Sequence, residues 1–486
     1  MKIKKRKKLA LLLLGAVMAC SAGAITANKA VKASAEEEVF VPRNLINEFM
    51  FGSWVSYYDL SIKSYAEQTE DMGAAGINFN WHPEAIGTDI NHDGANFYDY
   101  DAIEKAYADN GMMYLYDATK SGSNGYNDPA FKEMAKHCVG YYVKDEPSAS
   151  QFKATAELFD MCLKSDPERS PYVNLYPNYA GTTALGGTYA QHVQNFVDIV
   201  GAENLEYLSY DHYPFTASET VRNSYFSDME TIRKVGYNSG RLKTLGMPQS
   251  GWWAGMRKPN VDEMRWNVNT YVAYGFKAIS YFCWASPKYT SVADGGEAMQ
   301  DFVIDRDGTR TELYEPLAEQ NWQIRQLGDL LMSIDCAHAY HSGSNVADGA
   351  EKLPKSFFIQ PESKQDSYII SLFYNKDNTE TYVMIMNNST SESKRGKFSV
   401  SADSGVTSIT EFKSTVSGDN LPNHKDLKNT LGKPSQTEIS VESGVFETDF
   451  LPGEVKIYKL NGENISISEG VSTPELSHLS GTYYGA

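Results

Sequence analysis

Two carboxylic acids stand side by side at the end of an apolar segment. Residues 139–143 read VGYYV, and after Lys144 come Asp145, Glu146 and Pro147. A neighbouring negative charge raises the pKa of a carboxyl group, and an acid that stays protonated near neutral pH is suited to general acid catalysis. The alternative is structural, because acidic residues also stabilise a helix N-terminus and Pro147 could open a helix.

Asp145 and Glu146 end the fourth of eight apolar segments that are bounded by turn residues. Stretches with helical periodicity lie between these segments, and several end at Gly, as helices often do. Strands that alternate with helices predict parallel pairing, and eight such units in about 300 residues predict a closed (β/α)8 TIM barrel. An open doubly wound sheet is the alternative, but no phosphate-binding glycine motif follows the first segment. The segments are residues 48–55, 76–81, 112–117, 139–146, 172–177, 206–214, 243–250 and 278–286.

The remainder of the chain alternates in the manner of antiparallel strands. Residues 315–334 have the pattern of a helix that closes the barrel, and the residues after them lose this periodicity. Several short strands at close spacing then predict a β-sandwich. We therefore expect a (β/α)8 barrel at 36–340, a linker at 341–355, a β-sandwich domain at 356–460 and a flexible tail at 461–486.

The first 35 residues have the pattern of an export signal. A basic head precedes a short apolar core, and Ala-Ser-Ala at 33–35 fits a signal-peptidase site. We expect a secreted protein, with attachment to the cell surface through a lipid on Cys20 as the alternative. The apolar core is too short to predict a membrane span.

The charge of the remaining chain limits its partners. Without residues 1–35 the chain has 36 basic and 62 acidic residues, a formal charge of −26. Such a charge argues against nucleic acid and anionic lipid as partners and fits a neutral substrate. The composition does not predict an oligomeric state.

Neither a disulfide framework nor a metal centre is predicted. The four remaining cysteines lack paired spacing and are expected to be free thiols, and no zinc signature occurs in the sequence, so no cofactor is expected. Residues 89–94 (DINHDG) match the first half of a calcium loop, but Tyr100 stands where the bidentate Glu should be. An ordinary polar loop is therefore the preferred interpretation.

Polar and aromatic residues stand near the ends of all eight segments. In a TIM barrel the carboxyl ends of the strands form the active site, so we expect these residues to meet Asp145 and Glu146 there. Amide, carboxylate and aromatic groups together suit the binding of a sugar, whereas core packing would place aliphatic residues at these positions. The expected site residues are Trp54, Asn78, Trp81, Asp117, Asn174, Tyr176, Asp211, His212, Tyr213, Gln249, Trp252 and Trp284.

Several motifs resemble those of the clan A barrel glycoside hydrolases. They are DEP at 145–147, SYDHYPF at 209–215 and AISYFCWASP at 278–287, and the likeness extends into residues 305–331 and 450–460. In particular, the chain resembles uncharacterised bacterial members near the family 42 β-galactosidases. The resemblance implies a glycoside hydrolase with a carbohydrate substrate.

The resemblance also implies roles for individual residues. By position, Glu146 becomes the general acid, and Asp145 replaces the Asn that in the clan contacts the substrate. Gln249 stands where the clan has its nucleophilic Glu, and an amide cannot form a glycosyl ester.

Three mechanisms therefore stay open. Asp211, or Asp117, could activate a water for inversion, with the carboxyl groups about 6.5–9.5 Å apart. The substrate's own acetamido group could attack while Asp145 orients it, as in β-hexosaminidases, or the barrel could bind carbohydrate without catalysis. We prefer hydrolysis, with inversion by Asp211 slightly ahead and with Gln249 as a substrate ligand.

Overall fold

The structure, a computed structural model, describes residues 42–54, 60–81, 100–118, 125–218, 221–253, 255–286, 299–441, 443–465 and 467. The expected signal segment, Cys20, the 89–94 loop and nearly all of the expected tail lie outside these residues. Among the described residues no helix is long and apolar enough to cross a membrane.

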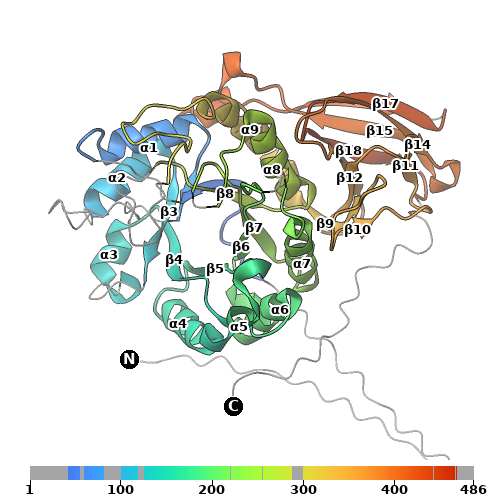
Figure 1. Cartoon of the computed structure of the whole chain (residues 1–486). Helices are drawn as coiled ribbons and strands as arrows, with labels where there is room; N and C mark the ends of the chain where they lie inside the picture. Colours follow the sequence, from blue (N-terminus) through green and yellow to red (C-terminus); the bar gives the residue numbers. More distant parts are fainter. Residues whose placement is uncertain are drawn as a thin grey trace, which may run out of the picture. The chain divides into compact units, whose positions relative to one another are not determined.

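Eight parallel strands form a closed barrel, in which each strand pairs with the next and β8 pairs with β1 (Figure 1). The predicted TIM barrel is thus confirmed. The strands are β1 Met50–Trp54, β2 Phe79–Asn80, β3 Met113–Asp117, β4 Cys138–Asp145, β5 Ser170–Leu175, β6 Tyr207–Asp211, β7 Lys243–Met247 and β8 Ala278–Phe282.

Helices surround the barrel strands (Figure 1). Several begin at polar caps of the expected kind, such as Ser64 with Glu67 and Asn260 with Glu263. The helices are α1 Tyr65–Ala74, α2 Tyr100–Asn110, α3 Pro129–Met134, α4 Phe152–Ser165, α5 Thr182–Leu185, α6 Tyr189–Val200, α7 Tyr225–Asn238, α8 Val261–Ala273, α9 Tyr314–Gln326 and α10 Gly328–Ser333.

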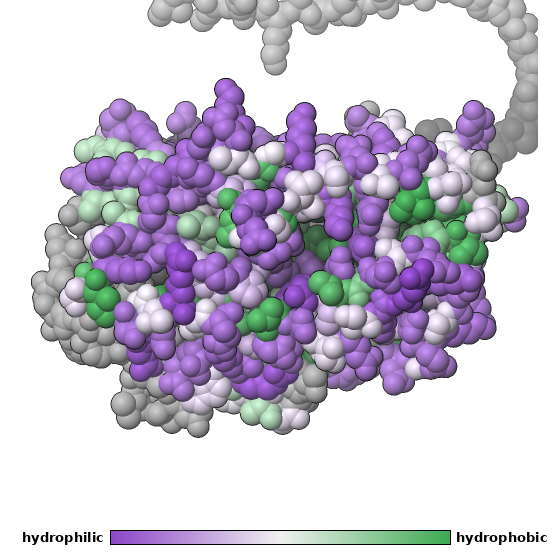
Figure 2. Space-filling model, turned by 90° about the horizontal axis from the view of Figure 1, so that it is seen from above, coloured by the Kyte–Doolittle hydropathy of each residue, from purple (hydrophilic) through white to green (hydrophobic). Residues whose placement is uncertain are grey.

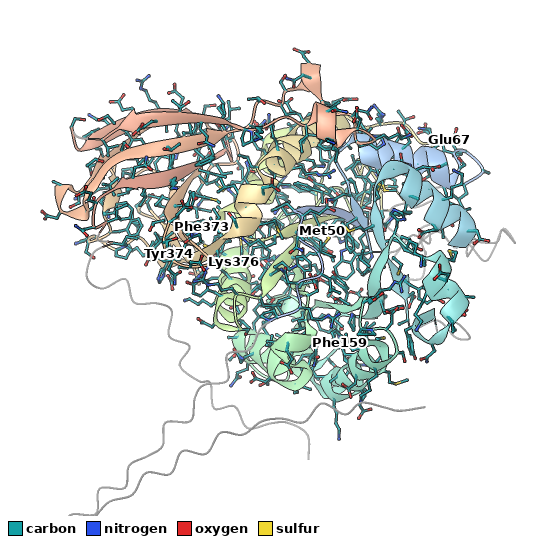
Figure 3. The ribbon with its side chains drawn as sticks, turned by 180° about the vertical axis from the view of Figure 1, so that it is seen from behind. Met50, Glu67, Phe159, Phe373, Tyr374 and Lys376 are labelled. Atoms are coloured by element: carbon teal, nitrogen blue, oxygen red, sulfur yellow. The ribbon has the colours of Figure 1, made fainter. Side chains whose placement is uncertain are left out.

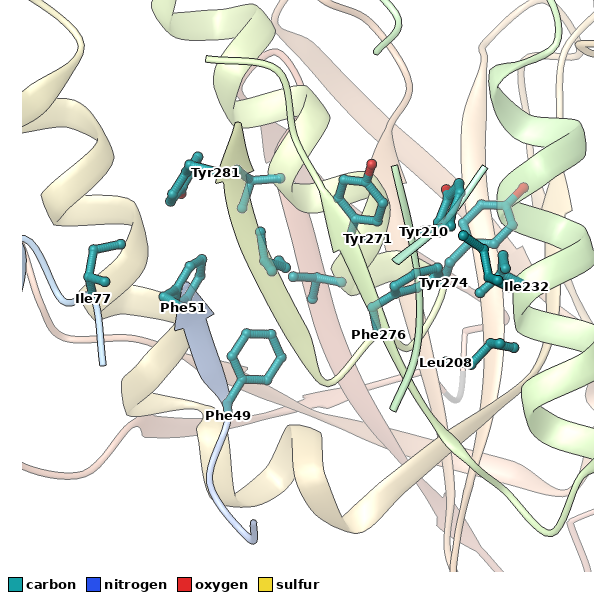
Figure 4. Close-up of a cluster of buried hydrophobic side chains, with 14 of the residues drawn as sticks. Phe49, Phe51, Ile77, Leu208, Tyr210, Ile232, Tyr271, Tyr274, Phe276 and Tyr281 are labelled. Atoms are coloured by element: carbon teal, nitrogen blue, oxygen red, sulfur yellow. The ribbon is translucent and has the colours of Figure 1, made fainter. Parts of the chain in front are cut away.

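The alternation of side chains along each strand divides the apolar residues between two cores. On β4, Tyr141 faces the surrounding helices and donates to Asp166, whereas Tyr142 faces the barrel interior and packs against Trp54 and Trp81. Figure 4 shows part of the outer core, where Tyr210 of β6 lies near Tyr271 of α8. Because both faces of the strands are buried, their sequences are apolar almost throughout.

A β-sandwich follows the barrel, as predicted. One sheet has seven strands and the other has three, and the pairing is antiparallel except between β9 and β10. The first strand, β9, lies within the range that the sequence assigned to the barrel except for its last residue, His341. The strands are β9 Ile334–His341, β10 Glu351–Lys352, β11 Ile359–Pro361, β12 Tyr368–Asn375, β13 Thr381–Asn387, β14 Lys394–Val400, β15 Val406–Lys413, β16 Ser435–Ser440, β17 Val445–Phe450 and β18 Val455–Gly462, with the short helix α11 Leu427–Thr430.

The sandwich packs directly on α8 of the barrel. The Trp266 indole donates to the Asn388 side chain at 2.9 Å, and Asn269 donates to the carbonyl of Gly453 at 2.8 Å. Gly453 has a φ of +66°, and a β-carbon there would lie 2.4 Å from the Trp266 backbone, so only glycine fits.

The end of β12 also meets the barrel. Phe373, Tyr374 and Lys376, labelled in Figure 3, lie there, and Arg241 donates to the carbonyl of Lys376 at 3.2 Å.

The four cysteines of the described chain are free and buried, as expected. The face in Figure 2 is mainly hydrophilic, and apolar side chains of the described residues appear there only in small separate groups. Among the described residues, the large apolar side chains that are exposed are Leu45, Ile62, Met161, Tyr179 and Leu451.

Candidate active site

Glu146 directly follows β4 and adopts an unusual backbone conformation. Its φ is +42°, a value that non-glycine residues rarely adopt, and its N–H donates to the carbonyl of Asn174 at 2.9 Å. Pro147 disfavours the helical region for the residue before it, which agrees with this turn. The Glu146 side chain is half-buried, whereas Asp145 is exposed.

The two acids do not cap the following helix. The capping position belongs to Ser148, whose N–H donates to the Gln151 side chain at 3.0 Å. The structural explanation for the acidic pair therefore loses its main support.

Asp211 ends β6 and lies buried against Glu146. The Asn174 amide donates to its carboxylate at 2.8 Å, and the Tyr213 hydroxyl and the Glu146 carboxyl group also hydrogen-bond to it. Because β4 and β6 flank β5, the two acids meet across the strand that carries Asn174.

The contact between the two acids gives them different proton affinities. Burial, followed by the charges of Asp211 and Asp145 and the hydrogen bond to Asp211, raises the pKa of Glu146 to about 9. Burial also raises the pKa of Asp211, to about 6, although hydrogen bonds from Asn174, Tyr213 and Glu146 limit that rise. Near pH 7 the pair therefore holds one proton between its two carboxyl groups.

This geometry differs from the spacing expected for inversion. A water must fit between the sugar and the base, so inverting carboxyl groups are about 6.5–9.5 Å apart. Glu146 and Asp211 instead hydrogen-bond to each other. The expected gap for a water is therefore not present between them in this structure, and inversion by Asp211 stays a prediction.

Aromatic residues of the barrel interior lie below the acids. Trp54 and Trp81, both expected in the site, pack with ring centroids 5.2 Å apart, and Tyr142 meets both edge-on. Burial, together with the charges of Asp145, Asp117 and Glu146, raises the pKa of Tyr142, so its hydroxyl is close to these acids. Asp117 itself is buried at the end of β3.

Tyr176 and Tyr213 lie beside the acids, as expected. Tyr176 is half-buried after β5, and burial followed by the charges of Glu146, Asp145 and Asp211 raises its pKa. Tyr213 packs against Trp253 and Phe282 with ring centroids about 5 Å apart. The expected Trp252 is half-buried and pairs through its backbone with Gln300.

Asn78 and Gln249 do not reach the pair. Asn78 precedes β2, and its amide hydrogen-bonds to Glu48 and to the backbone of Phe49 and Phe51 at the amino ends of the strands. Gln249 is fully buried, and its amide bonds only to backbone groups, those of residues 215, 251 and 257. Local contacts therefore already use the polar groups of both side chains, and the structure does not bring them to the acids.

His212 and Trp284 also face away from the barrel interior. His212 is fully buried, and its Nδ1 lies 2.8 Å from the Asp228 carboxylate of α7. Trp284 is buried against Tyr314 of α9, with ring centroids 5.8 Å apart. Each follows a strand at an outward position, so the structure does not bring either side chain to the acids.

Asn174 is next to the acids but is not a free ligand. It is buried, its Nδ2 donates to Asp211, and its Oδ1 accepts from Ser209 at 3.1 Å. Both ends of its amide are therefore used by Asp211 and Ser209.

Sequence reasoning missed Tyr142, Tyr179, Ser209, Trp253 and Phe282. The strand alternation that predicts an inward Asp211 also predicts an inward Ser209. Tyr142 lies on the same predicted strand as Asp145, three residues before it. Tyr179 lies outside the strands, in the 3-10 helix Asn178–Ala180, so strand alternation does not indicate it. Its ring lies 5.0 Å from that of His212, and Arg222 covers it at 3.9 Å.

No group of three or more His, Cys, Asp or Glu side chains within the described part of the chain could hold a metal ion. The calcium-like residues 89–94 and His82 lie outside that part.

Comparison with known proteins gives structural neighbours only. No known family and no curated protein matches the sequence. The family 51 α-L-arabinofuranosidase AbfB of Bifidobacterium longum is 9% identical, with a TM-score of 0.45 over 85% of this chain and 95% of that one. The α-L-arabinofuranosidase of Thermotoga maritima is 9% identical, with a TM-score of 0.44 over 85% and 96%.

The β-galactosidase of the psychrophilic Marinomonas ef1 is 11% identical, with a TM-score of 0.41 over 59% of this chain and 62% of that one. The likeness to family 42 that the sequence motifs suggest is not supported by these comparisons. The strand pairing itself establishes that the fold is a TIM barrel with a C-terminal β-sandwich.

Proposed function

We propose that this protein is a glycoside hydrolase that cleaves an oligo- or polysaccharide, with Glu146 as the general acid. The observation that carries the proposal is the hydrogen bond between Glu146 and Asp211 at the carboxyl ends of β4 and β6. An acid with a pKa raised to about 9 keeps its proton at neutral pH and can give it to a leaving group. The aromatic side chains around the pair offer apolar faces to a sugar.

The reaction begins when the Glu146 hydroxyl donates its proton to the glycosidic oxygen. The bond from the anomeric carbon to that oxygen breaks, and its electron pair stays on the oxygen. The carboxylates of Asp211 and Asp145 stabilise the positive charge that develops on the sugar, because opposite charges attract strongly in a buried site.

A specific observation favours substrate assistance in the step that breaks the glycosidic bond. Gln249 stands near the end of β7 where the clan has its nucleophile, and its buried amide is bonded to the backbone. The Asp211 carboxylate is hydrogen-bonded to Glu146. An acetamido group on the substrate would attack the anomeric carbon through its carbonyl oxygen as the leaving group departs, with Asp145 orienting it. Water then opens the resulting oxazolinium ion and gives a proton to the Glu146 carboxylate, which restores the acid. The second candidate is therefore a hydrolase of N-acetylated sugars.

The test is hydrolysis of a panel of plant, host and microbial glycans by the wild type and by Glu146→Gln. We expect the variant to lose about 10²–10⁴-fold in rate while its sugar affinity changes little, since the exchange preserves volume. Glu157→Gln, on the exposed face of α4, is the matched control and should behave as the wild type. Full activity of Glu146→Gln would remove Glu146 from the mechanism.

Two further outcomes separate the alternatives. A wild type that binds glycans tightly but releases no product would identify a non-catalytic carbohydrate-binding barrel. If the acetamido group attacks, fluorination of that group in an aryl glycoside should slow hydrolysis steeply, because fluorine withdraws electrons from the attacking oxygen. A rate that is independent of fluorination would exclude this route.

We also propose that the protein is exported, from the composition of residues 1–35. Mass spectrometry of the mature protein distinguishes a free chain that starts near residue 36 from a lipid-modified Cys20.

A further inference from the structure

We propose that Asn174 is a positioning residue that decides which acid of the Glu146–Asp211 pair carries the shared proton. Its amide donates to Asp211, keeps that carboxylate ionised and leaves the proton on Glu146. Only the catalytic role of this proton rests on the proposed function, because the hydrogen bonds around Asn174 are present in the protein without substrate.

The first step of the argument is the direction of the Asn174 amide. Its Nδ2 lies 2.8 Å from Asp211, and its Oδ1 accepts from the Ser209 hydroxyl at 3.1 Å. An ionised carboxylate can only accept hydrogen bonds, so the amino end of an amide suits it, whereas a carboxyl proton would need an acceptor. The amide therefore favours the ionised form of Asp211.

The second step is the link from Asn174 to Glu146. The carbonyl of Asn174 accepts the N–H of Glu146 at 2.9 Å, at the residue whose φ is +42°. Asn174 thus hydrogen-bonds to the side chain of Asp211 and to the main chain of Glu146. A change in its side chain should alter the ionisation of Asp211 without releasing the turn at Glu146.

The third step is the burial of the three side chains that hydrogen-bond in series, those of Ser209, Asn174 and Asp211. Ser209 is 1% exposed, Asn174 3% and Asp211 5%, so water does not compete for these hydrogen bonds. A hydrogen bond to a charged group in such surroundings is worth more than one between neutral groups. The other titratable groups that face Asp211 are Glu146 of β4 with Asp145 beside it, Tyr176 and Tyr179 after β5, Tyr189 of α6 and Tyr213 after β6.

The test is a pH titration of the substrate-free protein by infrared difference spectroscopy, which resolves the carbonyl band of protonated carboxyl groups. Glu146→Gln and Asp211→Asn assign the two titrations. We expect a protonated carboxyl band near pH 7 in the wild type, and we expect this band to be absent in Glu146→Gln.

In Asn174→Ala we expect the Asp211 titration to move up by about 1–2 pH units, the equivalent of one lost hydrogen bond to a charged group. Ser209→Ala should move it in the same direction by less, because the amide stays but loses its orienting partner. Asn80→Ala is the matched control: Asn80 is buried on β2 and donates to Tyr107 of the outer core, so neither titration should move.

An unchanged Asp211 titration in folded Asn174→Ala would overturn the proposal. If Asn174→Ala does not fold, an unchanged Asp211 titration in Ser209→Ala would overturn the proposal instead. A band at pH 7 that survives Glu146→Gln and disappears in Asp211→Asn would also overturn it. No substrate is used, so these outcomes are independent of whether any glycan is hydrolysed. With a substrate in hand, the acid limb of kcat/KM should move with the Asp211 titration.

Discussion

Gln249→Glu is the substitution that places the carboxylate of the clan at its expected position, and we predict that it harms the protein without adding a nucleophile. The Gln249 amide nitrogen donates to the carbonyls of Arg257 at 2.7 Å, Phe215 at 3.1 Å and Gly251 at 3.4 Å. Its oxygen accepts the N–H of Phe215 at 2.9 Å. These bonds tie the loop after β6 to the loop after β7.

The size of the destabilisation follows from the hydrogen-bond partners that remain for the carbonyl groups around residue 249. A carboxylate would face three carbonyl oxygens, so the group should stay protonated, and its single O–H can serve one of them. The carbonyl of Phe215 also accepts the N–H of Arg257 at 3.1 Å, so the exchange leaves one carbonyl without a donor. A buried unsatisfied group costs about 1–3 kcal/mol, and we therefore expect the free energy of unfolding to fall by about 1–3 kcal/mol.

The assay is urea denaturation followed by circular dichroism, with Gln191→Glu as the matched control. Gln191 accepts the N–H of Thr188 at the start of α6, where Glu serves as well as Gln, so this variant should unfold at the wild-type midpoint. An unchanged midpoint for Gln249→Glu would refute the reasoning. So would a covalent adduct of an activated fluorosugar on the introduced carboxyl group, which would show that the side chain reaches the substrate.

Two other predictions concern buried charges away from the site. Glu206→Gln should lower the free energy of unfolding by about 3–5 kcal/mol, measured in urea, because it leaves Lys243 at the base of the barrel without its buried counter-ion. Burial opposes ionisation of Glu351, but hydrogen bonds from His338 and Lys234 outweigh it and hold the pKa of Glu351 at about 2. Because the pKa of Glu351 is lower in the folded state than its unfolded value of about 4.5, its ionised carboxylate stabilises the folded protein above about pH 4.5. Glu351→Gln should therefore lower the melting temperature at pH 7, and this difference should vanish as the pH falls from about 4.5 to 2. A difference that persists at pH 2 would contradict this assignment.

The sequence determined the architecture and the strand ends that carry the acids. Apolar segments that alternate with helical periods specify parallel strands, because only the barrel or an open sheet buries both faces of such strands. Strand alternation also places Asp211 inward at the end of β6, and the run that ends in Asp145, Glu146 and Pro147 marks the end of β4. These features depend on residues close together in the chain, so the sequence alone reveals them.

Tertiary structure decided which polar residues are available to a substrate. Asn78 and Gln249 have suitable side chains near segment ends, yet contacts with distant backbone groups use them, and no local pattern shows such contacts. The direct bond between Glu146 and Asp211 is likewise a tertiary feature. It depends on closure of the barrel, which sets β4 and β6 on either side of β5, and on the left-handed turn at Glu146, and neither can be read from residues close together in the chain.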